Sequence, residues 1–229
     1  MDLQQISQYS DLTHQGPCLL FIAGGSVDFG MSRFRSWQKT LSSNGINSFA
    51  FNFPGVESAK GNVSETSLSS RAEMTKDIIN YLNNFLLNKK IFVFGTSMGG
   101  YIALSVLSDL ALKTNGLILD APAAYAQIAE NIEFGTKFSS LIRKQNSWMD
   151  SRSFKWLRSY ASPILFIEHE YDEIIPKPIT KKYQKNLKTT DRYIMIKDLP
   201  HDIWSKERRQ EKSLLLQEIL RFISQQSTA

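Results

Sequence analysis

The chain has 229 residues, of which 42% are hydrophobic and 21% are charged, and its formal net charge is +5. This length supports one well-buried core, and no Pro/Gly/Ser-rich linker divides it, so we expect a single domain over residues 1–229. Membrane-spanning and disulfide-built classes are excluded, because no apolar run reaches spanning length and Cys18 is the only cysteine.

The same features bear on location and partners. Residues 1–13 lack the basic and apolar parts of a secretory signal, and a lone cysteine in an apolar run suits a reducing compartment, so we expect a cytoplasmic protein. No basic stripe is interleaved with aromatic residues, so no nucleic-acid partner is expected. The three histidines, His14, His169 and His201, show no metal-ligand spacing, so we expect no metal and no cofactor.

Apolar runs of strand length alternate with segments of helical period. The predicted strands are residues 18–23, 46–53, 90–94, 117–120, 163–168 and 192–196. The predicted helices span about 31–44, 68–86, 101–112, 134–142 and 180–187, followed by a last helix with an apolar face over 215–223. Ser70 and Glu73 stand at capping-box spacing near the start of the second helix. The alternation predicts an α/β fold: a mostly parallel sheet of about six strands with helices on both faces.

The motif Gly95-Thr96-Ser97-Met98-Gly99 lies between a predicted strand and a predicted helix. A serine on such a tight turn needs small residues two positions before and after it, and Gly95 and Gly99 meet that need. The turn exposes the Ser97 hydroxyl above the helix N-terminus, where the backbone N–H of Met98 can stabilise an oxyanion. This context favours a nucleophilic serine over an ordinary turn with an incidental one.

Polar residues follow several strands at the edge where parallel strands end together. A serine hydroxyl needs a neighbouring base, and the base needs an acceptor that fixes its tautomer. Ser97, Asp172 and His201 supply these groups in chain order, each from a different strand end. The rivals of Asp172 for the acid role are Asp120, above all, and then Glu168 and Glu170.

These motifs resemble those of the α/β-hydrolase superfamily, and the resemblance covers nearly everything from Gly16 to Phe222. The elbow at 95–100 is the specific match, residues 167–176 resemble the acid loop, and residues 199–201 resemble the histidine loop. The small size is similar to compact serine hydrolases of the monoacylglycerol-lipase, serine-aminopeptidase-like and thioesterase branches. His169, at a strand end, is left with a structural role.

The loop after the first core strand departs from the family pattern. Relatives often have His-Gly there, whereas this chain has Ala23-Gly24. Because backbone N–H groups bind the oxyanion, the missing imidazole need not abolish that function. We expect Gly25 and Met98 to supply the oxyanion hole, with Ser26 as a less favoured donor than Gly25.

Residues 123–160 show no strand pattern and form a predicted helical, cap-like insertion. Its aromatic residues either pack on the domain as a small helical layer or form a cap over Ser97. In the second case the candidate walls of an acyl pocket are Phe134, Phe138, Trp148 and Met149. Six basic residues against three acidic ones favour anionic substrates, or weak contact with an anionic membrane surface.

Together these features predict a metal-independent serine hydrolase that cleaves a small-molecule acyl ester or thioester. Ser97 attacks, His201 takes the proton, and Asp172 holds His201. A peptidase that removes N-terminal residues is one alternative, in which Glu130 and Glu133 grip the substrate amine. A catalytically silent hydrolase fold that acts as a binding protein is the other.

Overall fold

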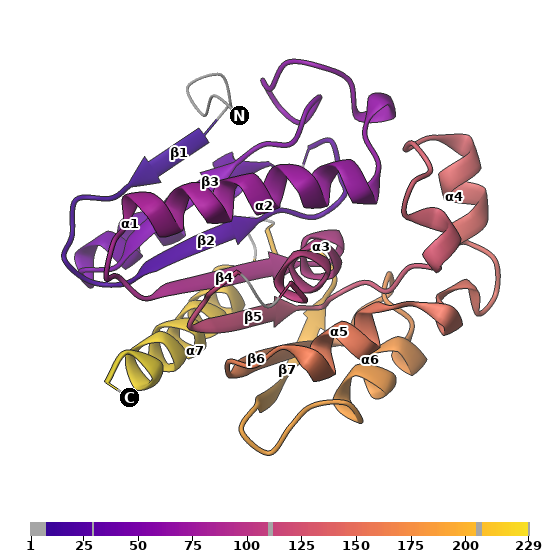
Figure 1. Cartoon of the computed structure of the whole chain (residues 1–229). Helices are drawn as coiled ribbons and strands as arrows, with labels where there is room; N and C mark the ends of the chain where they lie inside the picture. Colours follow the sequence, from indigo (N-terminus) through magenta and orange to yellow (C-terminus); the bar gives the residue numbers. More distant parts are fainter. Residues whose placement is uncertain (1–7, 29, 110–111, 205–207, 229) are drawn as a thin grey trace.

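The computed structural model describes residues 8–28, 30–109, 112–204 and 208–228. Its centre is a seven-stranded sheet of order β1-β3-β2-β4-β5-β6-β7 (Figure 1). The strands are β1 (Gln8–Asp11), β2 (Cys18–Ile22), β3 (Asn47–Phe51), β4 (Ile91–Thr96), β5 (Gly116–Asp120), β6 (Ile164–Tyr171) and β7 (Arg192–Pro200). The six strands β2 to β7 run parallel, as predicted, and β1 adds an antiparallel edge beside β3.

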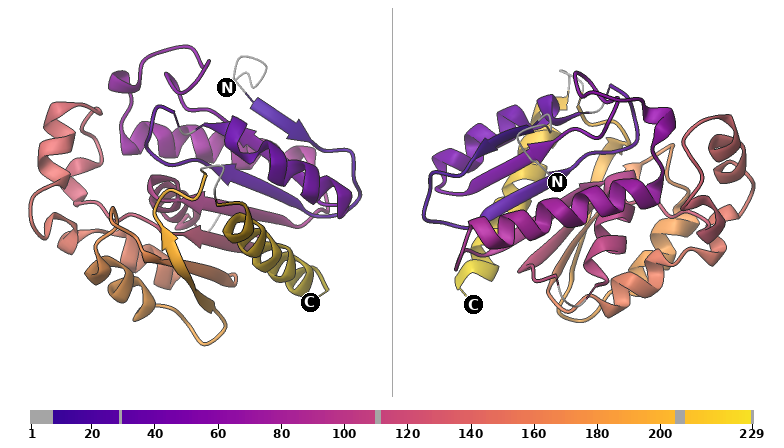
Figure 2. Two further views of the ribbon diagram at one scale, coloured as in Figure 1. Left: turned by 180° about the vertical axis from the view of Figure 1, so that it is seen from behind. Right: turned by 45° about the horizontal axis from the view of Figure 1, so that its top comes forward.

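Helices cover both faces of this sheet, which confirms the predicted α/β-hydrolase layers. The helices are α1 (Arg35–Ser43), α2 (Leu68–Phe85), α3 (Met98–Leu107), α4 (Thr136–Ile142), α5 (Ser153–Ser159), α6 (Lys177–Gln184) and α7 (Arg209–Thr228). Helices α1 and α7 lie on one face, and α2, α3, α5 and α6 lie on the other (Figure 2). Side chains of β2 alternate between the two faces: Leu19 and Phe21 pack in the core under α1 and α7. Leu20 and Ile22 pack in the core under α2 and α3.

Several boundaries differ from the sequence prediction because pairing overrides the local pattern. Strands β6 and β7 continue to the histidine loop, where Tyr171 pairs with Pro200. Helix α3 ends at Leu107, short of the predicted 112, and residues 110–111 lie outside the described part of the chain. Strand β1 is formed by polar residues whose sequence carries no strand signal, and only its pairing with β3 makes it a strand.

The capping box of α2 is a correction to the predicted one. Ser67, in extended backbone, is the N-cap, and its Oγ accepts from Ser70 N at 3.1 Å. Ser70 Oγ in turn accepts from Ser67 N at 2.8 Å. The helix begins at Leu68, three residues earlier than it would with Ser70 as its N-cap. Glu73 therefore lies in the second turn and takes no part in the capping box.

The predicted insertion lies between β5 and β6 and consists of four short helical pieces: η4 (Gln127–Ala129), α4, η5 (Ser147–Asp150) and α5. Helix α4 lies beyond the C-terminal ends of β2 and β4 (Figure 1). Two backbone hydrogen bonds tie the insertion to the start of α2, from Phe134 N to Thr66 O at 2.8 Å and from Ser69 N to Glu130 O at 2.9 Å. The insertion therefore lies next to the C-terminal ends of the parallel strands, which is where ligands bind in sheets of this kind.

Candidate active site

Ser97 occupies a strained turn between β4 and α3. Its φ is 53° and its ψ is −119°, a positive-φ conformation that costs a non-glycine residue on the order of 1–3 kcal/mol. A Cβ on Gly95 would lie 2.6 Å from Gly99 O, and one on Gly99 would lie 2.2 Å from Ile22 O. Both glycines are therefore required by close backbone approach, which is the steric reason predicted from the motif.

The neighbouring strand holds this turn in place. Ser97 N donates to Asp120 O at 2.9 Å, and Ser97 O accepts from Ala123 N at 3.0 Å. Ala121, between these two partners, also has a positive φ of 42°. The strain at Ser97 is thus supported by the first residues after β5.

His201 lies between Ser97 and Asp172. Its Nε2 is 3.1 Å from Ser97 Oγ, and its Nδ1 is 2.8 Å from Asp172 Oδ2. With the ring neutral, Nδ1–H donates to the carboxylate and Nε2 accepts from the serine hydroxyl, which is the arrangement of a base beside a nucleophile. The structure therefore brings together the three groups that the sequence singled out from three strand ends.

Asp172 is held as a carboxylate. Its Oδ1 accepts from the backbone N–H groups of Ile174 at 2.8 Å and Ile175 at 2.7 Å. Burial acts to raise the pKa of Asp172, but the hydrogen bond and charge of His201, together with these two N–H groups, outweigh it and lower that pKa below its ordinary value. The carboxylate is consequently available to orient the ring at neutral pH.

Asp120, the main rival for the acid role, is paired with a different histidine. Its Oδ1 lies 2.8 Å from His169 Nε2, and its Oδ2 accepts from Thr96 Oγ1 at 2.9 Å. His169 Nδ1 lies 2.9 Å from the carbonyl oxygen of Pro200. Because a carbonyl and a carboxylate only accept hydrogen bonds, both ring nitrogens of His169 donate. Burial acts to lower the pKa of His169, but the charge and hydrogen bond of Asp120 outweigh it and raise that pKa.

The two remaining rivals are also engaged elsewhere. Glu168 pairs with Lys177 Nζ at 3.0 Å, and Glu170 accepts from the backbone N–H of Asp198 at 3.0 Å. Glu173, from the same loop, accepts from His201 N at 3.2 Å and so steadies the histidine's backbone. Among these carboxylates Asp172 is the one that reaches the His201 ring.

The loops after β2 and β4 are neighbours, because the two strands pair with Ile22 opposite Gly95. Gly25 lies in the first loop, and Met98 is the first residue of α3, where a backbone N–H has no partner within the helix. Ser26 Oγ accepts from Asp28 N at 3.2 Å, so its hydroxyl takes part in shaping the loop. Gly25, Ser26, Ser97 and Met98 all line one cavity.

That cavity has a volume of about 470 Å3. Phe134, Phe138 and Ile142 line it from the insertion, while Ile174 and Trp204 line it from the acid and histidine loops. Sequence analysis missed the last three, although Ile174 and Trp204 stand two and three residues after Asp172 and His201. Gly24, Thr96 and Asp202 also line the cavity, and each adjoins a predicted site residue in the sequence. The remaining lining residues were not predicted, and their local sequence carries no signal: Arg33, Val63, Tyr125, Gly135 and Ser139.

Trp148 and Met149, two of the predicted walls, lie away from this cavity. The Trp148 ring packs against Phe154 at 6.1 Å, and Lys182 Nζ lies 5.5 Å from its centroid. Lys182 Nζ also donates to Met149 O at 2.9 Å, while the Met149 side chain is exposed. The η5 turn directs both residues toward α6, so of the four predicted walls Phe134 and Phe138 border the cavity.

The two glutamates of the peptidase alternative do not reach the cavity either. Glu130 is buried, accepts from Tyr101 Oη at 2.8 Å and pairs with Arg152. Glu133 borders a separate depression beside residues 131–137. Among the described residues that line the Ser97 cavity, Asp202 is the only carboxylate, and its Oδ1 lies 3.4 Å from Arg33 Nη1.

The described residues carry neither a metal-binding cluster nor a membrane-spanning helix. No group of three or more His, Cys, Asp and Glu side chains is placed there to hold a metal ion. Within the same ranges, no helix combines the length and apolar character that crossing a bilayer requires.

Comparisons with known proteins agree with this fold. The model of the family described as serine aminopeptidase, S33 matches residues 20–162. A monoacylglycerol lipase of Paleococcus ferrophilus superposes with a TM-score of 0.75 at 18% identity, over 97% of this chain and 99% of that one. Est1E of Butyrivibrio proteoclasticus, solved with ferulic acid, gives 0.77 at 16% identity, over 98% and 96%. An esterase of Exiguobacterium antarcticum gives 0.68 at 14% identity, over 95% of each chain. A search of the curated proteins found no match.

Proposed function

Because this chain belongs to the serine aminopeptidase S33 family of α/β-hydrolases, we propose that it is a serine hydrolase of carboxylic ester or thioester bonds. The observation that carries the proposal is the pair of contacts made by His201, 3.1 Å to Ser97 Oγ and 2.8 Å to Asp172 Oδ2. We also take the whole chain, 1–229, as one hydrolase domain with residues 123–160 inserted as its cap.

In the proposed acylation step, Ser97 Oγ attacks the acyl carbonyl carbon while His201 Nε2 takes the hydroxyl proton. The negative charge that develops on the carbonyl oxygen is stabilised by the N–H groups of Gly25 and Met98, aided by the N-terminus of α3. The tetrahedral intermediate then breaks its bond to the leaving oxygen or sulfur, which receives the proton from His201. An acyl-Ser97 ester and a free alcohol or thiol result.

Deacylation repeats these steps with water. His201 Nε2 removes a proton from a water molecule as its oxygen attacks the acyl-enzyme carbonyl, and the same two N–H groups bind the oxyanion. Collapse returns the proton to Ser97 Oγ and releases the carboxylic acid. Asp172 keeps its charge throughout and stabilises the imidazolium of each step.

The lining of the cavity supports an acyl substrate over a peptide with a free N-terminus. A free amine would be bound by an unpaired carboxylate, and Asp202, the acid at the rim, already faces Arg33. Glu130 and Glu133, which could have served, lie outside this cavity. The aromatic and aliphatic walls are the surface that an acyl chain would fill.

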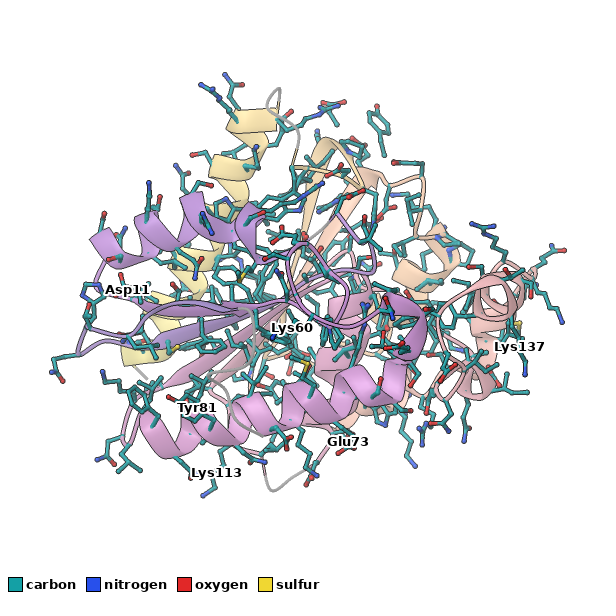
Figure 3. The ribbon with its side chains drawn as sticks, turned by 90° about the horizontal axis from the view of Figure 1, so that it is seen from above. Asp11, Lys60, Glu73, Tyr81, Lys113 and Lys137 are labelled. Carbon is teal, nitrogen blue, oxygen red and sulfur yellow. The ribbon has the colours of Figure 1, made fainter. Side chains whose placement is uncertain are left out.

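Membrane-surface contact through the basic insertion stays a prediction. Lys137 lies on α4, at the end of the molecule opposite Asp11 (Figure 3). Not all of the insertion's positive charge can contact a membrane, since Arg152 is neutralised by an ion pair with the buried Glu130.

A fluorophosphonate probe tests the proposal directly. We expect it to label Ser97, and Ser97→Ala to lose both labelling and hydrolysis of p-nitrophenyl acyl esters while unfolding at an unchanged temperature. Ser139→Ala is the matched control, because Ser139 lines the same cavity. Ester hydrolysis that survives Ser97→Ala would contradict the proposal.

A substrate panel separates the alternatives. Acyl esters, acyl thioesters of matched chain length and aminoacyl anilides are compared by kcat/KM. Higher values for the anilides would favour the N-terminal peptidase. An unlabelled, well-folded protein that hydrolyses none of them would favour the silent binding protein.

A further inference from the structure

Arg71 is a buried cation without an acid. Its side chain is among the largest that are fully buried, with 1% of its surface exposed. Among the described residues, no Asp or Glu oxygen lies within 4.0 Å of its guanidinium, and its Nη2 has no hydrogen-bond partner. Burial lowers the pKa of Arg71 to about 10, which still leaves it charged at neutral pH.

The position of Arg71 in α2 adds to this electrostatic cost. It is the fourth residue of the helix, in the first turn after the Ser67 cap, where the helix dipole favours negative rather than positive charge. A leucine or methionine would fill the same space between aromatic rings without either penalty. The guanidinium is therefore poorly explained as packing alone.

The groups around the guanidinium contact its two faces and leave one edge without a hydrogen-bond partner. Its Cζ lies 4.7 Å from the centroid of Phe53 and 4.6 Å from that of Phe134, so the plane is enclosed between two rings. Nε donates to Thr66 Oγ1 at 3.4 Å, and Nη1 lies 3.7 Å from Met98 Sδ. A hydroxyl at 3.4 Å and a thioether sulfur are both weak acceptors, and the two rings offer no acceptor atom. The two Nη groups of the guanidinium therefore have no strong acceptor among the described residues.

That edge lies one side chain behind the wall of the substrate cavity. Met98 and Phe134, which both touch the guanidinium, also line the cavity around Ser97. The Met98 side chain extends from Arg71 to the loop after β2 that contains Gly25. A Cβ added to Gly25 would lie 2.7 Å from Met98 Cε. Methionine is unbranched and adaptable, so a rotation of this side chain would move its sulfur away from Nη1 on the side of Arg71 that faces the cavity wall.

We propose that Arg71 binds a carboxylate of the substrate, so that the preferred ester carries a carboxylate a short chain away from the scissile carbonyl. This inference rests on the proposed ester hydrolysis. A planar carboxylate matches the guanidinium fork and fits edge-on into a slot between two rings, whereas a tetrahedral phosphate does not. The short spacer follows from Met98, whose backbone N–H serves the oxyanion while its own side chain covers Arg71.

Three esters with one leaving group test this on the unaltered protein. They are mono-p-nitrophenyl glutarate, its methyl diester, which replaces the carboxylate with a neutral ester, and p-nitrophenyl pentanoate, which replaces it with a methyl group. We expect kcat/KM for the half-ester to exceed that for either neutral ester by about 10-fold or more, as a charged hydrogen bond in a buried site provides. Equal or lower values for the half-ester would overturn the proposal.

Two substitutions of Arg71 locate the effect. Arg71→Met should lower the half-ester to pentanoate ratio by about 10- to 100-fold, and Arg71→Lys, which keeps charge but loses the fork, should lower it less. Arg33→Met is the control, because Arg33 is a cavity cation already facing Asp202, and it should leave the ratio unchanged. A ratio that follows Arg33 instead would overturn the proposal.

The failure of the two proposals would look different. If the neutral esters are cleaved by Ser97 and the half-ester has no advantage, the role of Arg71 is wrong and ester hydrolysis stands. If none of the three esters is cleaved, ester hydrolysis fails and the substrate role of Arg71 falls with it. Should Arg71→Met not fold, the comparison of the three esters on the unaltered protein still decides.

Discussion

Two histidine–aspartate pairs of the same length lie at neighbouring strand ends. The ring nitrogen to carboxylate distance is 2.8 Å in both His201–Asp172 and His169–Asp120. His201 and Asp172 have 17% and 5% of their side chains exposed, whereas His169 and Asp120 have 1% each. The second ring nitrogen faces a serine hydroxyl in the first pair and the carbonyl of Pro200 in the second.

The third partner decides what each pair does. A hydroxyl both donates and accepts, so His201 can take a proton from it; a carbonyl only accepts, so His169 keeps both of its protons. Pro200 directly precedes His201, and Asp120 also bonds Thr96, directly before Ser97. The buried pair therefore links the loops that carry His201 and Ser97, the proposed base and nucleophile, and each histidine should respond differently to substitution.

The largest effect is expected for His201→Gln. Loss of the base should reduce kcat for a p-nitrophenyl ester by about 10,000- to 1,000,000-fold, the range seen when one member of a triad is removed. The free energy of unfolding should change by less than about 1 kcal/mol, because the ring is partly exposed and accounts for few buried contacts. Urea unfolding and initial rates measure both quantities, and near-normal activity would remove His201 from the mechanism.

His169→Gln should show the opposite balance. Asp120 and the Pro200 carbonyl are bonded by different ring nitrogens, whereas both donors of glutamine are on one nitrogen and its other terminal atom only accepts. One buried partner is then left unpaired, and the free energy of unfolding should fall by about 3–5 kcal/mol. Activity of the protein that remains folded should fall less than for His201→Gln, about 10- to 100-fold, because Pro200 and hence His201 lose their anchor. A stability loss below 1 kcal/mol would show that the buried pair anchors nothing.

The pH dependence of stability sharpens the same contrast. The folded-state pKa of His169 is raised, so its charge stabilises the protein fully below the ordinary histidine value of about 6.5 and ceases to do so as pH rises through the raised value. Asp120→Asn keeps the hydrogen bonds with a neutral ring and removes the ion pair. Asp120→Asn should lower the free energy of unfolding by less than His169→Gln does. In urea titrations this loss of stability should become smaller from pH 6 to pH 9. A loss that grows over this range would contradict the assignment.

The smallest effect is expected for Asp202→Asn. Asp202 adjoins His201 but has 64% of its side chain exposed and faces Arg33 at 3.4 Å, an exposed pair worth under about 1 kcal/mol. Thermal unfolding should change little, and hydrolysis of neutral esters should keep its order of magnitude. A loss comparable to that of Asp172→Asn would mean that the wrong carboxylate has been placed beside the ring.

Much of the site could be predicted because its signals are local. The elbow motif lies within five residues, and a Cβ on Gly95 would meet the backbone of Gly99 inside that motif. Gly99 is required instead by the carbonyl of Ile22 on the neighbouring strand β2. The continuous apolar runs of β2, β4 and β5 predict buried parallel strands, and this prediction does not require knowing which strands pair with them. Strand β1 is the opposite case, because four polar residues become a strand only through their pairing with β3.

The sequence by itself determined the order of the six parallel strands, the tight turn that exposes Ser97, and the strand-end loops that carry Asp172 and His201. Tertiary structure decided which of two similar aspartates meets which of two histidines, and that Trp148 and Met149 lie beside α6. It also decided that Arg71 is buried with no acidic partner in the described part of the chain. The physical reason is range: backbone sterics and periodicity act over a few residues, whereas hydrogen-bond partners and burial depend on side chains brought together from distant parts of the chain.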